Sequence, residues 1–366
     1  DTYTYEQLSS GTNEDGSWYG TIRWNGDDYW CSLNSDGSTV VSGTRWNNYT
    51  YSYVTRPNGT ITVPIYQWQY RAMPFDTTLV KGASGTDPLR NATFQVRMAG
   101  YPSPSPDMIN VYFNGCIEER ATYEIDDYDN VNFSRALDLD IDLVPTPGEQ
   151  ATQWRPIFHE LSFIPEIWWD GNGTFNPTVT TQNDYLMAAW AGLSACPTPA
   201  RKLAEMTTTE VASYVDTLNP DGSTYHDIGM IWGGRLLSPT GIFASENADT
   251  DGRPTSRHMI FLTDGETSTY DLSYGTYGIE PLDQRRWSTN SALSLDQVVE
   301  ARFGVACNEV KKRNITVWVI GFGTVLNPIM TECAGPGRSF VANDAAELQN
   351  VFSKIAAQLG DLRIAK

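Results

Sequence analysis

Apolar residues along this chain change their spacing near residue 200. Up to that point they stand in short aromatic and β-branched runs, separated by Asn-Gly and Asp-Gly pairs. Beyond it, residues 258–263 and 315–323 form two almost continuously apolar runs. Runs of this kind are typical of strands buried on both faces of a parallel sheet. The pattern therefore predicts an α/β region in the later part of the chain.

Helical spacing accompanies these two predicted strands. Four segments show it: 207–222, 225–239, 294–314 and 344–360. Ser294 and Gln297 form a capping-box pattern at the start of the third segment. Alternating helices and strands predict a doubly wound, mainly parallel sheet with helices on both faces. We assign residues 151–366 to this α/β domain.

Residues 1–150 predict a β-rich module instead. Four turn pairs interrupt the aromatic and β-branched runs and indicate hairpins: Asn25-Gly26, Asp36-Gly37, Asn58-Gly59 and Asn114-Gly115. Residues 138–145 alternate acidic and apolar side chains, which predicts a half-exposed strand. We interpret this module as an insertion before the α/β domain.

The excess of acidic residues limits the kinds of partner that this chain can bind. The 366 residues include 25 Lys and Arg against 44 Asp and Glu, a formal net charge of −19. Nucleic acids and anionic membranes need basic patches, so neither is expected as a partner. No apolar run approaches the roughly 20 residues that span a bilayer. The chain begins at Asp1 without Met, so we expect a processed or partial product with any export signal or anchor upstream.

Five cysteines raise the question of disulfides or metal. None stands in a Cys-x-x-Cys pair and the chain has three His, so a zinc site is not expected. The Trp-, Tyr- and Asn-rich texture resembles that of exported proteins, which favours disulfides. Sequence does not fix connectivity. Our working pairs are Cys307–Cys333, across a helix–strand pair, and Cys116–Cys196, with Cys31 left over.

Oxygen donors gather where two predicted elements meet. Asp264 follows the strand 258–263, and Thr224 precedes a helix. Ligands of open parallel sheets bind beyond the carboxyl ends of the strands, so these two residues could share a hard cation such as Mg, Ca or Mn. The structural alternatives are a helix N-cap for Thr224 and a turn acid for Asp264.

Three stretches, 221–239, 259–266 and 315–323, resemble the later half of a von Willebrand factor A domain. With "NGCIEERATYE", "QWRPIF" and "TECAGPGRSFVANDAAELQNVFSKIA", the chain resembles the TadG-type proteins of bacterial Tad (Flp) pilus systems over about residues 110–366. The resemblance implies a non-enzymatic extracellular or cell-envelope protein that acts in adhesion or pilus assembly, with pilus components as partners. It also implies that Thr224 and Asp264 hold a divalent cation.

One departure from the family matters. Its Asp-x-Ser-x-Ser motif, which ends the first strand beside the strand carrying Asp264, is absent from this chain. We therefore expect a sheet without its first strands, with an open edge at 258–263. An N-terminal fragment or a second chain would complete it, or the sheet is rearranged and binds no metal. Asp227, Glu266 and Asp271 are weaker substitute ligands.

Two other functions stay open. The chain could be a structural subunit of a surface filament or layer, completed by strand addition from its neighbour. Alternatively, residues 1–150 could bind or hydrolyse carbohydrate. Five tryptophans are candidate stacking platforms, although aromatic residues more often fill a core: Trp18, Trp24, Trp30, Trp46 and Trp68. No nucleophile elbow or phosphate loop is present, and we expect no enzymatic activity.

Overall fold

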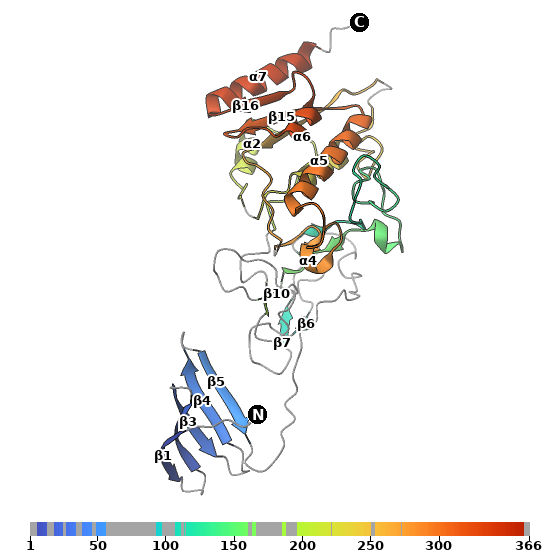
Figure 1. Ribbon diagram of the computed structural model, residues 1–366. Helices are drawn as coiled ribbons and strands as arrows, with labels where there is room; N and C mark the ends of the chain where they lie inside the picture. Colours follow the sequence, from blue (N-terminus) through green and yellow to red (C-terminus); the bar gives the residue numbers. More distant parts are fainter. Residues whose placement is uncertain are drawn as a thin grey trace. The chain divides into compact units, whose positions relative to one another are not determined.

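The computed structural model describes residues 113, 115–159, 196–220, 222–249, 253–271 and 273–361, together with the backbone of nine further strands (Figure 1). The chain divides into two compact units, Asp1–Tyr66 and Gln67–Lys366. The division thus falls between Tyr66 and Gln67, whereas the sequence pattern places a boundary near residue 150. Each unit is described on its own.

The first unit is a five-stranded antiparallel sheet in the order β1-β2-β3-β4-β5. Its strands are β1 (Glu6–Thr12), β2 (Trp18–Trp24), β3 (Asp27–Leu33), β4 (Thr39–Arg45) and β5 (Tyr49–Thr55). Trp24 pairs with Asp27 across the two residues Asn25-Gly26, as the hairpin prediction requires. The register of β1 against β2 shifts between Gln7 and Ser9. Residues 6–55 thus contain five strands, within the range for which the sequence predicts a β-rich module.

The second unit contains a three-stranded parallel sheet in the order β12-β15-β16. Its strands are β12 (Arg257–Thr263), β15 (Ile315–Phe322) and β16 (Ser339–Ala342). All seven residues of β12 pair in unbroken register with β15, from Arg257 opposite Ile315 to Thr263 opposite Gly321. The two apolar runs therefore form strands of a parallel sheet, as predicted, and the structure shows that they are neighbours.

Helices cover both faces of this sheet (Figure 1). They are α3 (His226–Leu237), α5 (Leu295–Lys312), α6 (Pro328–Ala334) and α7 (Ala345–Asp361). One core layer joins α3, α5 and α6 to Met259, Val317 and Val319 of the sheet. The other joins α7 to Trp318 and Ile320, which point to the opposite face because side chains alternate along a strand. The α/β class is confirmed at this level.

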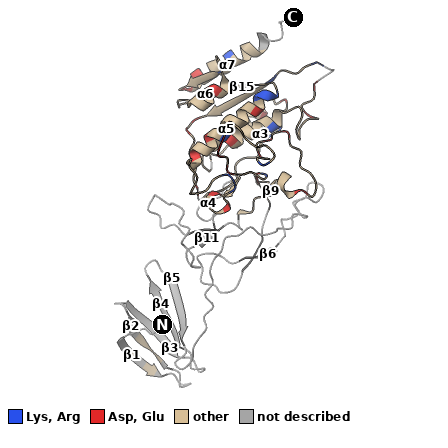
Figure 2. Ribbon diagram, turned by 45° about the vertical axis from the view of Figure 1, so that its right-hand side comes forward, with Lys and Arg blue, Asp and Glu red and all other residues tan. Residues whose placement is uncertain are grey.

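The ends of the helices follow local sequence signals. The capping box at Ser294 forms as predicted, because Gln297 and Ser294 exchange side-chain and backbone hydrogen bonds. Acids lie near the start of α5 and Lys311 and Lys312 in its last turn (Figure 2). Negative charge at the start of a helix and positive charge at its end both interact favourably with the helix dipole.

Shorter elements complete the second unit. The described residues also form the helices η1 (Gln150–Thr152), α2 (Thr208–Val215) and α4 (Glu280–Asp283). Four small antiparallel pairs join β6 (Thr93–Val96) to β7 (Asp107–Asn110), β8 (Ile117–Glu118) to β9 (Arg155–Pro156), β10 (Phe163–Pro165) to β11 (Tyr185–Met187), and β13 (Tyr274–Gly275) to β14 (Gly278–Ile279).

The strand predicted at 138–145 is wrong. This segment forms successive turns, with Leu139 N donating to Ala136 O and Leu143 N to Asp140 O. Leu139 and Ile141 are nevertheless fully buried against α3 and α5. Asp138 is buried as well, so the alternation of acids and apolar residues does not separate a buried face from an exposed face in this segment.

Candidate functional site

The two predicted cation ligands lie on loops that the fold brings side by side. Thr224 forms an isolated antiparallel bridge with Ser268, in which Thr224 N donates to Ser268 O at 2.7 Å. Ser268 stands four residues after Asp264 in the loop that leaves β12. The N-cap of α3 is Tyr225 and not Thr224, so the capping alternative for Thr224 is wrong. Thr224 therefore sits just outside the helix, on the strand-end side.

His226, the first residue of α3, links the segment after Thr224 to the loop that carries Asp264. Its Nε2 lies 2.9 Å from Thr263 Oγ1 and its Nδ1 lies 3.0 Å from Thr267 Oγ1, so the ring spans the loop that carries Asp264. Burial lowers the pKa of His226, and the nearby charge of Asp264 only partly offsets this. A neutral ring donates through one nitrogen and accepts through the other, which suits two hydroxyl neighbours.

A cavity of about 360 Å³ opens beside this loop, at the carboxyl ends of β12 and β15. Three acids line it: Glu266 from the loop, and Asp296 and Glu300 from α5. Asp296 accepts hydrogen bonds from the backbone N and the Oγ1 of Thr269, at 2.8 and 2.7 Å. Ligands of open α/β sheets bind at this edge.

Thr224 and Asp264 offer oxygen atoms, which hard cations prefer, but too few of them to fill the coordination shell of one ion. Thr224 is half-buried and Asp264 is exposed, so both are open to a ligand. A Mg-type ion takes about six oxygen ligands, and these two side chains offer at most three. Glu266 is exposed nearby and can add to them. The rest of the shell would come from water or from a partner.

Asp227 takes no part in such a site, which corrects its assignment as a substitute ligand. It is completely buried, and its Oδ2 accepts a hydrogen bond from Arg286 Nη1 at 2.5 Å. Burial raises the pKa of Asp227, whereas Arg286 and Arg302 lower it. Asp271, the other weak candidate, is half-buried in the loop that follows.

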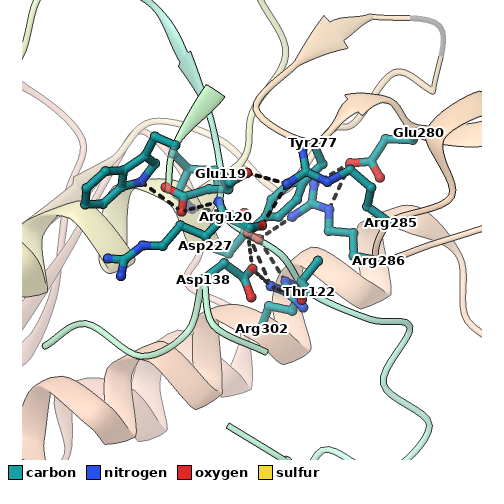
Figure 3. A network of polar contacts seen from close by, with 12 residues as sticks. Glu119, Arg120, Thr122, Asp138, Asp227, Tyr277, Glu280, Arg285, Arg286 and Arg302 are labelled. Atoms are coloured by element: carbon teal, nitrogen blue, oxygen red, sulfur yellow. Dashed lines mark hydrogen bonds and ion pairs between the residues drawn. The ribbon is translucent and has the colours of Figure 1, made fainter. Parts of the chain in front are cut away.

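Asp227 belongs to a buried network of charged side chains (Figure 3). In the described part of the chain, four arginines and four carboxylates are buried together: Arg120, Arg235, Arg286, Arg302, Glu119, Asp138, Asp227 and Glu280. Equal numbers of the two signs make the group formally neutral. Buried charges persist only when paired.

One end of the network is the pair Glu119–Arg235. Arg235 donates to both Glu119 oxygens, at 2.6 and 2.9 Å, and to the Asp138 carbonyl at 2.7 Å. Trp154 Nε1 donates to Glu119 at 3.3 Å, and the guanidinium of Arg120 lies 4.1 Å from the Trp154 ring centroid.

The other end joins the hairpin of β13 and β14 to α5. Tyr277 and Arg302 both donate to Asp138, and Arg286 bridges Glu280 and Asp227. Burial alone would lower the pKa of Arg286, but Glu280 and Asp227 beside it raise it. These groups are closed to solvent, so the network fastens segment 117–143 to the helices and offers no binding surface.

Both predicted disulfides are present. Cys307 on α5 is bonded to Cys333 on α6, and Cys116 is bonded to Cys196. Cys333 lies within α6 (Pro328–Ala334), so this disulfide joins two helices. His159 lies against the Cys116–Cys196 pair, and the potential ligand atoms of the three residues are all within 4.8 Å of one another. Sequence reasoning missed this grouping because the members are 43 and 37 residues apart.

The candidate sugar platforms cannot be placed. Trp46 and Trp68 lie outside the described residues, and only the backbones of Trp18, Trp24 and Trp30 are described, in β2 and β3. Their role stays a prediction.

Among the described residues, no helix combines the length and apolar character needed to cross a bilayer. No protein-family model, curated protein or solved structure matches the chain.

Proposed function

We propose that this chain is a non-enzymatic binding protein of the cell envelope or the extracellular space. In this proposal its α/β unit is a von Willebrand factor A-like sheet of the TadG type, acting in adhesion or pilus assembly. A protein partner completes the sheet by adding a strand to β12. Among the described strands, β12 has a neighbour on one side only, and this is the observation that carries the proposal.

The side chains of β12 resemble those of a strand that has a neighbour on each side. Among the described strands it pairs with β15 alone. Met259 is buried, whereas Ile260 and Leu262 are 38% and 49% exposed on the face that α7 covers over β15 and β16. Soluble proteins usually protect such an edge with charges, proline or a bulge. Apart from Arg257 at its start, β12 has no Lys, Arg, Asp, Glu or proline, and its pairing with β15 has no bulge.

The same edge fixes the chemistry of the partner. An added strand gains backbone hydrogen bonds along β12 and needs apolar side chains at alternate positions to cover Ile260 and Leu262. Its end would lie next to Asp264, the exposed acid of the candidate cation site. Oxygen ligands on the partner would then complete the shell of a Mg, Ca or Mn ion begun by Thr224 and Asp264.

The two disulfides support an oxidising location, because disulfides persist in exported proteins and are rare in the cytosol. The buried charged network argues against catalysis at its own position, since its groups are closed to substrates. The alternative of a self-assembling surface subunit uses the same edge, with a second copy as the neighbour.

Native mass spectrometry of the assembly from its source, with peptide mapping, tests the proposal. A photo-crosslinking residue at position 262 should join the chain to one second polypeptide. The same residue at Leu203, which is 73% exposed, is the matched control and should not. Thr224→Ala and Asp264→Ala, or removal of divalent cations by a chelator, should reduce recovery of the complex.

Three outcomes separate the possibilities. A distinct polypeptide at position 262 with cation dependence supports binding as proposed. Crosslinks to another copy of this chain would transfer support to the surface-subunit alternative. A single chain that crosslinks to nothing at position 262 would overturn strand addition, and the cation site would lose its missing ligands with it.

A further inference from the structure

Cys116, His159 and Cys196 converge although they are distant in sequence. Their ligand atoms lie within 4.8 Å of one another, and all three residues are half-buried. The pairing of β8 with β9 explains part of this, because Ile157 N donates to Cys116 O at 2.9 Å and so places His159 close by. The Tyr274 ring packs edge-on against His159, with centroids 6.4 Å apart.

Two thiolates and one imidazole are a typical ligand set for zinc. Zn²⁺ binds Cys sulfur at about 2.3 Å and His nitrogen at about 2.0 Å, and three protein ligands leave a fourth position for water. This set differs in kind from the oxygen donors at Thr224 and Asp264, which favour harder ions. The two candidate sites would therefore select different metals.

The backbone spacing fits both a disulfide and a metal. The Cα atoms of Cys116 and Cys196 are 5.9 Å apart. Tetrahedral zinc holds its two sulfurs about 3.8 Å apart, as follows from the Zn–S length. Rotation of the two side chains can supply this separation while the backbones keep their spacing. Loss of the disulfide thus leaves a preformed pocket of ligands.

We propose that Cys116, His159 and Cys196 bind Zn²⁺ in the reduced chain, as the alternative to the Cys116–Cys196 disulfide. A dithiol reductant breaks the S–S bond and donates two electrons and two protons, and is itself oxidised to a disulfide. Zn²⁺ then binds the two sulfurs and the imidazole and releases both thiol protons to solvent. The disulfide belongs to oxidising surroundings and the metal to reducing ones. Either link ties residue 196 to the segment 115–159.

The second cysteine pair provides an internal control. Cys307 and Cys333 also have Cα atoms 5.9 Å apart, yet they are 1% and 3% exposed. Among the described residues, the group at Cys116 alone brings together three Cys, His, Asp or Glu residues whose ligand atoms lie within 4.8 Å of one another. Reduction should therefore create one zinc site and not two.

The test measures Zn²⁺ and Co²⁺ binding by the full chain, oxidised and after reduction with a phosphine. The phosphine becomes its oxide, with water supplying the oxygen and the two protons. The reduced chain should bind one equivalent, and its Co²⁺ form should show sulfur-to-cobalt charge-transfer absorption. His159→Ala should weaken Zn²⁺ binding about 100-fold or more, since loss of an outer-shell partner already costs roughly 10–100-fold. His258→Ala is the matched control and should leave the affinity for Zn²⁺ and the Co²⁺ absorption unchanged.

Thiolate absorption is needed because a chain of net charge −19 also attracts cations to its carboxylates. Cys116→Ser with Cys196→Ser should abolish the absorption, whereas Cys307→Ser with Cys333→Ser should keep it. If the reduced chain unfolds without metal, circular dichroism provides the readout. Adding Zn²⁺ should then refold the native sequence but not His159→Ala. Absence of the absorption, or equal affinity in His159→Ala, would overturn the proposal.

Discussion

Glu119 and Arg235, 116 residues apart in the sequence, form a bidentate ion pair in which both side chains are completely buried. Removing one partner of such a pair leaves an uncompensated charge in the interior. Glu119→Gln is therefore expected to destabilise the second unit by about 3–5 kcal/mol. Urea unfolding followed by hydrogen exchange of α3 and α5 amides measures the change.

An exposed ion pair is the control for this prediction. Lys202 and Glu246 are 2.6 Å apart but 60% and 42% exposed. Lys202→Ala should leave the unfolding midpoint unchanged, because solvent screens such pairs. An unchanged midpoint in Glu119→Gln would mean that Arg235 finds another buried acceptor.

Local signals account for the elements that sequence predicted correctly. Ser294 and Gln297 meet three residues apart, so the start of α5 can be predicted from its own residues. The apolar run of β15 likewise carries its own signal, because burial on both faces demands it. Both predicted disulfides also form, although nothing local distinguishes their connectivity.

The polar interior could not be predicted in this way. Asp138 contacts Arg302 across 164 residues, and segment 138–143 forms turns in which Asp138, Leu139 and Ile141 are all buried. His226 joins Thr263 and Thr267 only once α3 and β12 have packed together. Such contacts depend on tertiary packing, and sequence spacing gives no indication of them.

The Cys307–Cys333 disulfide should stabilise the packing of α5 against α6. It closes a loop with a sequence separation of 26 residues. Loop-closure entropy then predicts that Cys307→Ser with Cys333→Ser costs about 3.5 kcal/mol. Thermal unfolding of the oxidised chain measures this. Identical unfolding curves for the variant and the native chain would show that unfolded-state constraint is negligible here.

Stability should fall as the pH drops below about 6.5, partly because of His258. Trp318 Nε1 donates to His258 Nδ1 at 3.2 Å, a bond that a protonated ring cannot accept. Burial, and then the charge of Arg338, lower the pKa of His258 from its ordinary value of 6.5. The unfolded chain therefore takes up a proton near pH 6.5 that the folded chain accepts only at lower pH.

His258→Gln should reduce this pH dependence without abolishing it, because burial also lowers the pKa of His226. Melting temperatures at pH 7.5 and 5.5 provide the comparison. The native chain should lose more stability between these values than the variant does. Equal losses would show that His258 is protonated equally in the folded and unfolded states.

The exposed face of β12 should control association of the isolated chain. Leu262 is 49% exposed, so Leu262→Lys should fold normally and place a charge where a neighbouring strand would pack. We expect less concentration-dependent association in sedimentation velocity than for the native chain. Leu203→Lys, at a position that is 73% exposed and outside both β12 and the cavity beside Asp264, is the control and should behave like the native chain. Met259→Lys should unfold the unit, since Met259 is only 6% exposed within the core between β12 and α3. If Leu262→Lys associates as strongly as the native chain, contacts elsewhere hold the copies together and β12 is not the binding edge.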